Sequence, residues 1–183
     1  MNGLQVAVMG TVDGGVVAAI EQVLRRTFHL RVSRIDLPDP EFAYDHHRAQ
    51  YGSVPLLQSL AALRGSGGGK LLGITAHDLF IPMLTFVFGQ AQVGGEVALL
   101  STARLRQEFY HMPPDAEVLE LRARKEALHE VGHLFGLLHC SNPLCAMALA
   151  TNINQLDGKR AEFCVACAGA LGRLSPAVEG WEP

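Results

Sequence analysis

The sequence is poor in charge and has no basic cluster. Only 18% of its 183 residues are charged, the formal net charge is −3, and no run of lysine and arginine is longer than a pair such as Arg25 and Arg26. Proteins that bind nucleic acid concentrate positive charge in patches or stripes along one surface. We therefore expect no nucleic-acid partner.

Long apolar segments are missing as well. No window reaches the eighteen or so apolar residues of a membrane span, and the nearest approach, residues 79–89, is interrupted by Pro82. The first ten residues have neither the basic start nor the long apolar centre of a signal peptide. The expectation is a cytoplasmic protein that does not associate with a membrane.

The remaining composition is that of a folded domain. Apolar residues make up 49% of the chain, which is far above the content of disordered proteins. A chain of this length is sufficient for one sizeable core. We expect residues 1–183 to form a single domain divided by a cleft.

The hydrophobic pattern favours an α/β fold. Residues 4–10 read as a buried strand, residues 16–28 have apolar residues at helical spacing, and residues 29–37 alternate like a second strand. This order and these lengths predict a parallel βαβ unit. Further expected elements are a helix at 54–63, a turn at 65–69, a strand at 71–75, paired strands within 85–91 and 95–101, and a final helix at 162–174.

A long helix is expected from Asp115 to about residue 135. Pro113 and Pro114 precede it, and the Asp115 carboxylate can cap its free amide groups. Its apolar residues are expected to pack on the sheet, and they are Leu121, Leu128, Val131, Leu134, Phe135 and Leu138. Its charged residues are expected on a solvated face, and they are Arg122, Arg124, Lys125 and Glu126.

The end of this helix carries the motif HExxHxxGxxH. His129 and His133 are four residues apart, so they lie one turn from each other on the same helical face. Gly136 can end the helix and reverse the chain because glycine adopts positive φ without a steric penalty. His139 is thereby returned toward the first two histidines. Three imidazoles leave a fourth zinc position open for water, which is typical of a catalytic site, and Glu130 lies beside it.

Two simpler readings compete with a zinc site. A short HExxH match arises by chance in many helices, where a histidine is commonly an ordinary core residue and Glu130 would be an exposed helical glutamate. Gly136 and His139 extend the pattern to five fixed positions, which strongly favours zinc over chance.

All four cysteines of the chain follow the histidines. Cys140 and Cys145 form a Cys-x4-Cys group, and Cys164 and Cys167 form a Cys-x2-Cys group after eighteen intervening residues. This grouping fits a structural zinc held by four thiolates. The alternatives are two disulfides or four unrelated buried thiols.

Residues 129–167, HExxHxxGxxHCx4CxM followed by CxxC, resemble the archaemetzincins, a branch of the metzincin metalloproteases. The likeness extends through YDHHRAQY at 44–51, DLFIPMLTFVFGQA at 78–91 and GGEVALLSTARL at 94–105, and so covers most of the chain.

This resemblance implies a fold and a set of site residues. The fold would be a metzincin-like mixed twisted sheet with packed helices, in which residues 1–136 form the sheet and the zinc helix. Residues 137–183 would form a small C-terminal part with the third histidine, the second zinc and the Met-turn. Glu130 would be the catalytic residue, His129, His133 and His139 would hold a catalytic zinc, and the four cysteines would hold a structural one. Met147 would be the Met-turn residue beneath the histidines.

In metzincins an edge strand above the zinc receives the substrate by strand addition. Residues 96–100 would occupy that place, although an ordinary interior strand fits them equally well.

The favoured function is a zinc-dependent peptidase, acting as an endopeptidase or an aminopeptidase on a peptide or protein substrate. Glu130 would take a proton from the zinc-bound water and pass it to the leaving amine. A catalytically weak zinc-dependent peptide-binding module is the main alternative, and a zinc-ribbon adaptor is a third. The intact Glu130 and His139 favour the enzyme.

Overall fold

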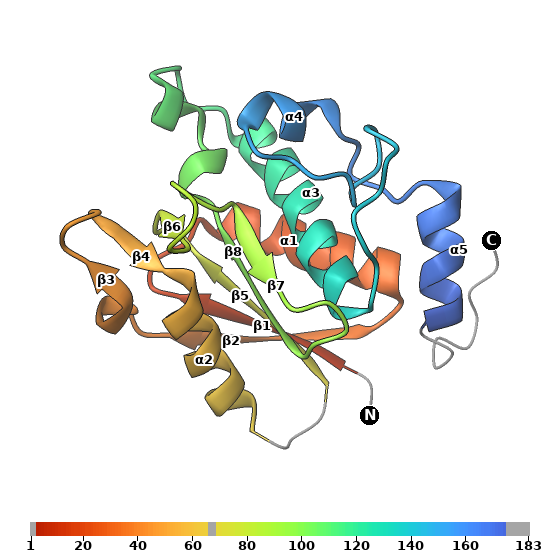
Figure 1. The fold of residues 1–183 in the computed structure, drawn as a ribbon, viewed down its shortest axis with the longest axis horizontal. Helices are drawn as coiled ribbons and strands as arrows, with labels where there is room; N and C mark the ends of the chain where they lie inside the picture. Colours follow the sequence, from red (N-terminus) through yellow and green to blue (C-terminus); the bar gives the residue numbers. More distant parts are fainter. Residues whose placement is uncertain (1–2, 66–68, 175–183) are drawn as a thin grey trace.

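A five-stranded sheet forms the centre of the protein (Figure 1). The structure is a computed structural model, and it describes residues 3–65 and 69–174. The strand order is β2-β1-β5-β8-β7, and only β7 runs antiparallel to its neighbour. The strands are β1 (Gly3–Met9), β2 (Arg31–Leu37), β5 (Lys70–Thr75), β7 (Gly89–Ala91) and β8 (Val97–Ser101).

Helices cover both faces of this sheet. Helices α1 (Gly14–Phe28) and α3 (Ala116–Leu134) pack on one face, and α2 (Ser53–Arg64) packs on the other (Figure 1). The side chains of β1 alternate between the two faces of the sheet. Val6 and Val8 belong to the core with α1 and α3, whereas Ala7 and Met9 belong to the core with α2. The sheet is therefore buried on both sides, as parallel sheets usually are.

Smaller elements surround the sheet. A second, three-stranded sheet has the order β3-β4-β6, formed by Tyr44–Asp45, Gln50–Gly52 and Leu79–Phe80. Short 3-10 helices span Glu41–Ala43, Ala103–Leu105 and Gln107–Tyr110. After α3, the chain forms α4 (Ile153–Gly158) and α5 (Val165–Leu174), which lie on the same side of the sheet as α3 (Figure 1).

The predicted fold class is confirmed. The βαβ unit, the long helix and the mixed sheet are all present, and β7 and β8 pair as expected. The expected strand at 85–91 is regular only from Gly89, and the final helix begins at Val165 rather than at 162. The predicted turn at 65–69 lies partly outside the described residues, since 66–68 are not among them.

The structure decides between the two readings left open for residues 96–100. They belong to an interior strand, because β8 pairs with β5 on one side and β7 on the other. The edge strand is β7.

The expectation of a solvated face on α3 was wrong. That face is largely buried, since Arg122, Lys125 and Glu126 are 3 to 4% exposed. Their partners come from α4 and the segments beside it, which the helix sequence alone does not reveal.

Among the described residues, no helix combines the length and the apolar character needed to span a membrane.

Candidate metal centre

Helix α3 places the first two histidines. Asp115 caps its start by accepting a hydrogen bond from the Val118 amide (3.0 Å), as predicted. The apolar face packs into the main core, although Leu121 and Leu138, expected to be buried, are exposed. His129 and His133 are both buried and separated by one helical turn. The helix therefore supplies a rigid support for this pair.

A glycine turn brings the third histidine back. Gly136 has φ of 91°, a conformation that strongly favours glycine. The amide of Leu137 bonds to the Gly132 carbonyl (3.0 Å), which closes the end of α3. The chain then reverses, and the His139 ring lies 5.2 Å from the His129 ring and 4.9 Å from the His133 ring, centre to centre.

The three imidazoles converge on one point. Each offers a nitrogen atom, and these nitrogens all lie within 4.8 Å of one another. The Nε2 atoms of His129 and His133 are 3.2 Å apart. Two nitrogens bound to one tetrahedral zinc would be separated by roughly 3.3 Å. The donor set and its spacing therefore fit zinc.

Backbone carbonyls orient two of these rings. The Nδ1 of His129 donates to the Ala146 carbonyl (2.9 Å), and the Nδ1 of His133 donates to the Leu137 carbonyl (2.8 Å). This leaves Nε2 of each ring as the free lone pair. Burial lowers the pKa of His129 to about 3 and also lowers the pKa of His133. Both rings are thus held neutral at physiological pH, as metal binding requires.

Met147 packs against helix α3 at Gly132, the residue before His133. Its side chain is fully buried, and its carbonyl accepts a hydrogen bond from the Cys140 amide (2.9 Å). The Met147 sulfur packs against Gly132, where a Cβ atom would collide with it. The geometry is compatible with the Met-turn role that the resemblance implies.

Two glutamates of α3 lie beside the histidines. Glu126 and Glu130 are each 4% exposed, and each has one carboxylate oxygen, Oε2, with no hydrogen-bond partner among the described residues. Burial raises the pKa of Glu130 well above its ordinary value, and the neighbouring Glu126 raises it further, while Lys159 lowers it. Burial raises the pKa of Glu126 as well.

The sequence interpretation did not include Glu126 or Lys159 in the site. Lys159 is also 4% exposed and acts electrostatically on both carboxylates. The four-residue spacing of Glu126 and Glu130, one helical turn, was the available signal for the first of them. No local pattern marks Lys159.

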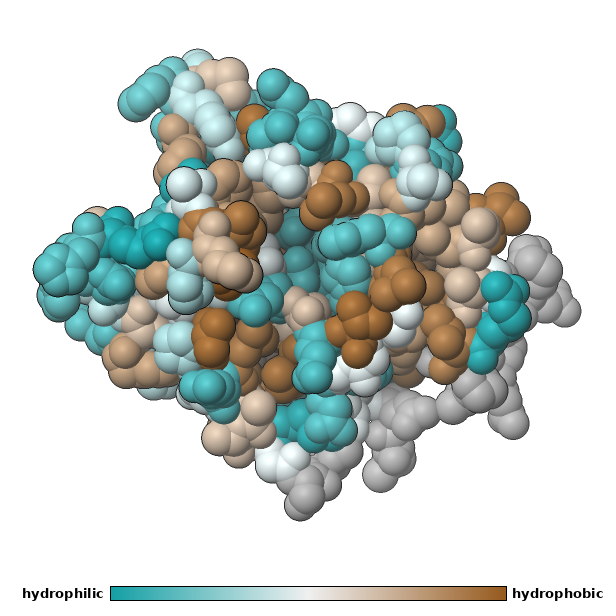
Figure 2. Space-filling view, viewed as in Figure 1, coloured by the Kyte–Doolittle hydropathy of each residue, from teal (hydrophilic) through white to brown (hydrophobic). Residues whose placement is uncertain are grey.

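A cleft opens over these groups. A cavity of about 430 Å³ is bounded on one side by β7 and on another by α3, and Figure 2 shows this face of the molecule hollowed near its centre. Apolar side chains form much of its wall, and they are Ile81, Leu84, Phe86, Val87, Phe88, Leu149 and Ala150. The three histidines, Glu126 and Glu130 also line it. The cleft is therefore mainly apolar with a few convergent polar groups, which is typical of a ligand site.

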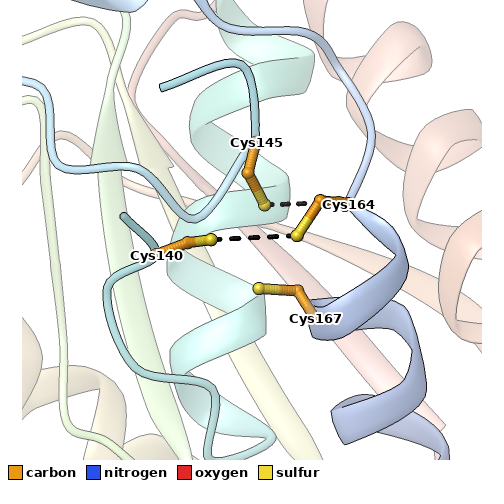
Figure 3. A group of neighbouring side chains, drawn as sticks. All are labelled: Cys140, Cys145, Cys164 and Cys167. Atoms are coloured by element: carbon orange, nitrogen blue, oxygen red, sulfur yellow. Dashed lines mark hydrogen bonds between the residues drawn. The ribbon is translucent and has the colours of Figure 1, made fainter. Parts of the chain in front are cut away.

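The four cysteines form a second cluster. Their sulfur atoms all lie within 4.8 Å of one another, and Figure 3 shows them pointing toward a common centre from the loop after α3 and from the start of α5. The sulfurs of Cys140 and Cys164 are 3.8 Å apart. Sulfurs of a tetrahedral zinc site are separated by roughly 3.8 Å.

The chemistry of this cluster also fits a metal. All four thiols are free rather than paired in disulfides. A hydrogen bond from the Cys167 backbone lowers the pKa of Cys164 to about 7, which favours the thiolate that binds metal. The amides of Cys164 and Asn142 donate to the sulfurs of Cys145 (3.3 Å) and Cys140 (3.4 Å).

Comparison with known proteins gives consistent results. A sequence profile of peptidase family M54 matches residues 14–173. The Archaemetzincin of Methanocaldococcus jannaschii is 42% identical over 134 residues, which are 73% of this chain and 72% of that protein. The Archaemetzincin of Pyrococcus abyssi is 37% identical over 175 residues, which are 91% of this chain and 93% of that protein.

Solved structures are similar as well. The zinc-dependent peptidase of Methanocorpusculum labreanum superposes with a TM-score of 0.84 at 34% identity, covering 92% of this chain and all of that chain. The Archaemetzincin of Methanopyrus kandleri has a TM-score of 0.82 at 34% identity and covers 96% of both chains.

With this fold, the clustered histidines and these relatives, the protein falls in the class of zinc-dependent metallopeptidases. Within that class, the chain belongs to peptidase family M54, the archaemetzincins.

Proposed function

We propose that the protein hydrolyses peptide bonds at a zinc ion held by His129, His133 and His139, with Glu130 as the general base. The observation that carries this proposal is the position of Glu130, whose buried carboxylate lines the same cavity as the three imidazoles and has an oxygen with no partner among the described residues. A bound zinc would polarise the scissile carbonyl and lower the pKa of a coordinated water to about 7.

Glu130 would move the proton in this reaction. Its free Oε2 takes a proton from the attacking water and then delivers it to the leaving amine. A raised pKa suits such a group, because a carboxyl that titrates nearer neutrality can both accept and release a proton. The depressed pKa of His129 keeps that ring available as a ligand while Glu130 changes its protonation.

Strand β7 is the proposed place for the substrate backbone. The Phe88 carbonyl accepts a hydrogen bond from the Ser101 amide (2.8 Å), so the antiparallel alternation points the backbone groups of Gly89 and Ala91 away from β8. β7 is the edge of the sheet and lines the cavity. An extended peptide paired with these groups would pass in front of the histidines.

The second metal site is proposed to be structural. Four thiolates saturate a tetrahedral zinc and leave no position for water. The cluster ties the turn after α3 to the start of α5, and His139 immediately precedes Cys140. A zinc there would therefore hold the catalytic part of residues 137–174 in place, within the single domain that we propose for the whole chain.

Replacement of Glu130 by glutamine distinguishes the two functional hypotheses, a peptidase and a peptide-binding module. Glu130→Gln keeps the shape of the side chain but removes the base, so zinc content should be unchanged and peptide cleavage should fall by about 10²- to 10⁴-fold. Glu117→Gln is the matched control, since Glu117 lies exposed on the same helix. Cleavage by Glu130→Gln at the rate of that control would remove Glu130 from the mechanism.

A further inference from the structure

Lys159 is a buried lysine whose side chain contacts the segment 146–148. Its backbone caps the end of α4, and its side chain is enclosed with 4% exposure. The Nζ atom donates to the carbonyls of Ala146 (3.1 Å) and Ala148 (3.0 Å), on either side of Met147. A buried ammonium group is costly unless it is well paired, so its retention here calls for a reason beyond packing.

One of these carbonyls is shared with a candidate zinc ligand. The Ala146 carbonyl accepts from Lys159 Nζ and also from Nδ1 of His129 (2.9 Å). The position of this oxygen sets the ring orientation of His129, because the hydrogen bond fixes which nitrogen faces the metal. Lys159 therefore acts on His129 through a single intervening atom.

The ammonium group also faces the buried acids of the cleft. Burial raises the pKa of Glu126 and of Glu130, and the charge of Lys159 opposes that rise. Burial lowers the pKa of Lys159, and the two carboxylates oppose that fall. Cys145, the residue before Ala146, acts on Lys159 as well. The Lys159 ammonium group thus contacts the segment 145–148. This segment contains Cys145, Met147 and the Ala146 carbonyl that bonds to His129.

We infer that Lys159 is a positioning residue for the zinc-binding histidines, which fixes the Ala146 carbonyl against His129 and supplies the buried positive charge opposite Glu126 and Glu130. This inference rests on the function proposed above. Groups that orient metal ligands typically change metal affinity or activity by about 10- to 100-fold when they are removed. Zinc bound at the histidines should respond to Lys159 by that amount.

The chain supplies a matched control in Lys125. This lysine is also buried, with 3% exposure, and its Nζ also donates to two backbone carbonyls, those of Leu156 (3.1 Å) and Asp157 (2.9 Å). Both lysines thus anchor the α4 region. Neither carbonyl bonded by Lys125 belongs to the 145–148 segment or accepts from a histidine ring among the described contacts.

The experiment compares Lys159→Met with Lys125→Met in the full-length, zinc-loaded protein. Zinc affinity is measured by competition with a chelator, and the histidine site is identified as the class of bound zinc that His133→Ala lacks. We expect both methionine variants to lower the thermal midpoint. Only Lys159→Met should weaken zinc at the histidine site, by about 10- to 100-fold, and lower kcat with little change in KM.

Equal zinc affinity and kcat in the two variants would overturn the inference and make Lys159 an anchor of the fold alone. If Lys159→Met does not fold, the same comparison is made with Lys159→Gln, which keeps a neutral donor but lacks the charge and the reach to both carbonyls. Wild-type zinc affinity in that variant would also overturn it. If the wild type and His133→Ala bind the same amount of zinc, the histidines hold no zinc and the proposed function is wrong. That result differs from equal zinc affinity in the two lysine variants, which would overturn only the role of Lys159.

Discussion

Met147 packs its sulfur atom directly against Gly132, the residue that precedes His133 on helix α3. The contact leaves no room for a side chain at position 132, since a Cβ atom there would collide with the Met147 sulfur and would also meet the Met147 methyl group and the Phe163 ring. The histidine pair and the buried methionine are therefore fitted to each other through a glycine.

Gly132→Ala should displace Met147 or the helix. Because the core around Met147 is closely packed, we expect a loss of about 1–3 kcal/mol in the free energy of unfolding and weaker zinc binding at the histidines. Denaturation by urea and zinc competition would measure the two effects. Gly158→Ala is the control, since a Cβ there meets nothing within 4 Å. Equal stability of the two variants would show that the contact is unimportant.

The edge strand gives a second prediction. Ala91→Pro removes an amide that points away from β8, so the sheet should survive while substrate pairing is weakened. A lost hydrogen bond of ordinary strength should raise KM for a peptide roughly 3- to 10-fold. Ala91→Val, which keeps the amide and adds bulk, should have the KM of the wild type. Equal KM in both variants would argue against strand addition at β7.

A third prediction concerns pH. Because burial lowers the pKa of His129 from 6.5 to about 3, the unfolded chain takes up a proton as pH falls below 6.5 and the folded chain does not. His129 thus contributes stability that is full above the ordinary histidine pKa and declines as pH falls. The buried glutamates act in the opposite direction, since their raised pKa favours the folded state as pH falls.

The contribution of His129 can be isolated by comparison with His129→Gln after chelation of metal from the histidine site. The difference in free energy of unfolding, wild type minus variant, should decrease by about 2 kcal/mol from about pH 7.5 to about pH 5. Urea denaturation across that range would measure it. A difference that stays constant with pH would mean that the ring is not held neutral in the folded protein.

The sequence was most informative where the relevant geometry is local. The spacing of His129 and His133 translates directly into one helical face, and Gly136 predicts the reversal that brings in His139. The two cysteine groups were also found by spacing. The parallel βαβ unit was predicted from the spacing of apolar residues, which has the period of a strand, then of a helix, then of a strand. That spacing is a property of residues close together in the sequence.

The sequence was misleading where partners are remote. Arg122 looked solvated, yet it is buried in a two-point ion pair with Asp157 (2.7 and 2.6 Å), thirty-five residues away. β3 and β6 are only two residues long and have no periodicity to detect. The edge position of β7 depends on the order of the whole sheet, so no local pattern distinguishes it from β8.

The central claim is that the chain holds one zinc at the histidines for catalysis and one at the cysteines for structure. The most direct measurement is the zinc content of the wild type, His133→Ala and Cys164→Ala, each followed by cleavage of a mixed peptide library. We predict about two zinc ions per chain in the wild type and about one in each variant, with cleavage abolished in His133→Ala. About one zinc in the wild type, retained in His133→Ala and lost only in Cys164→Ala, would contradict the account.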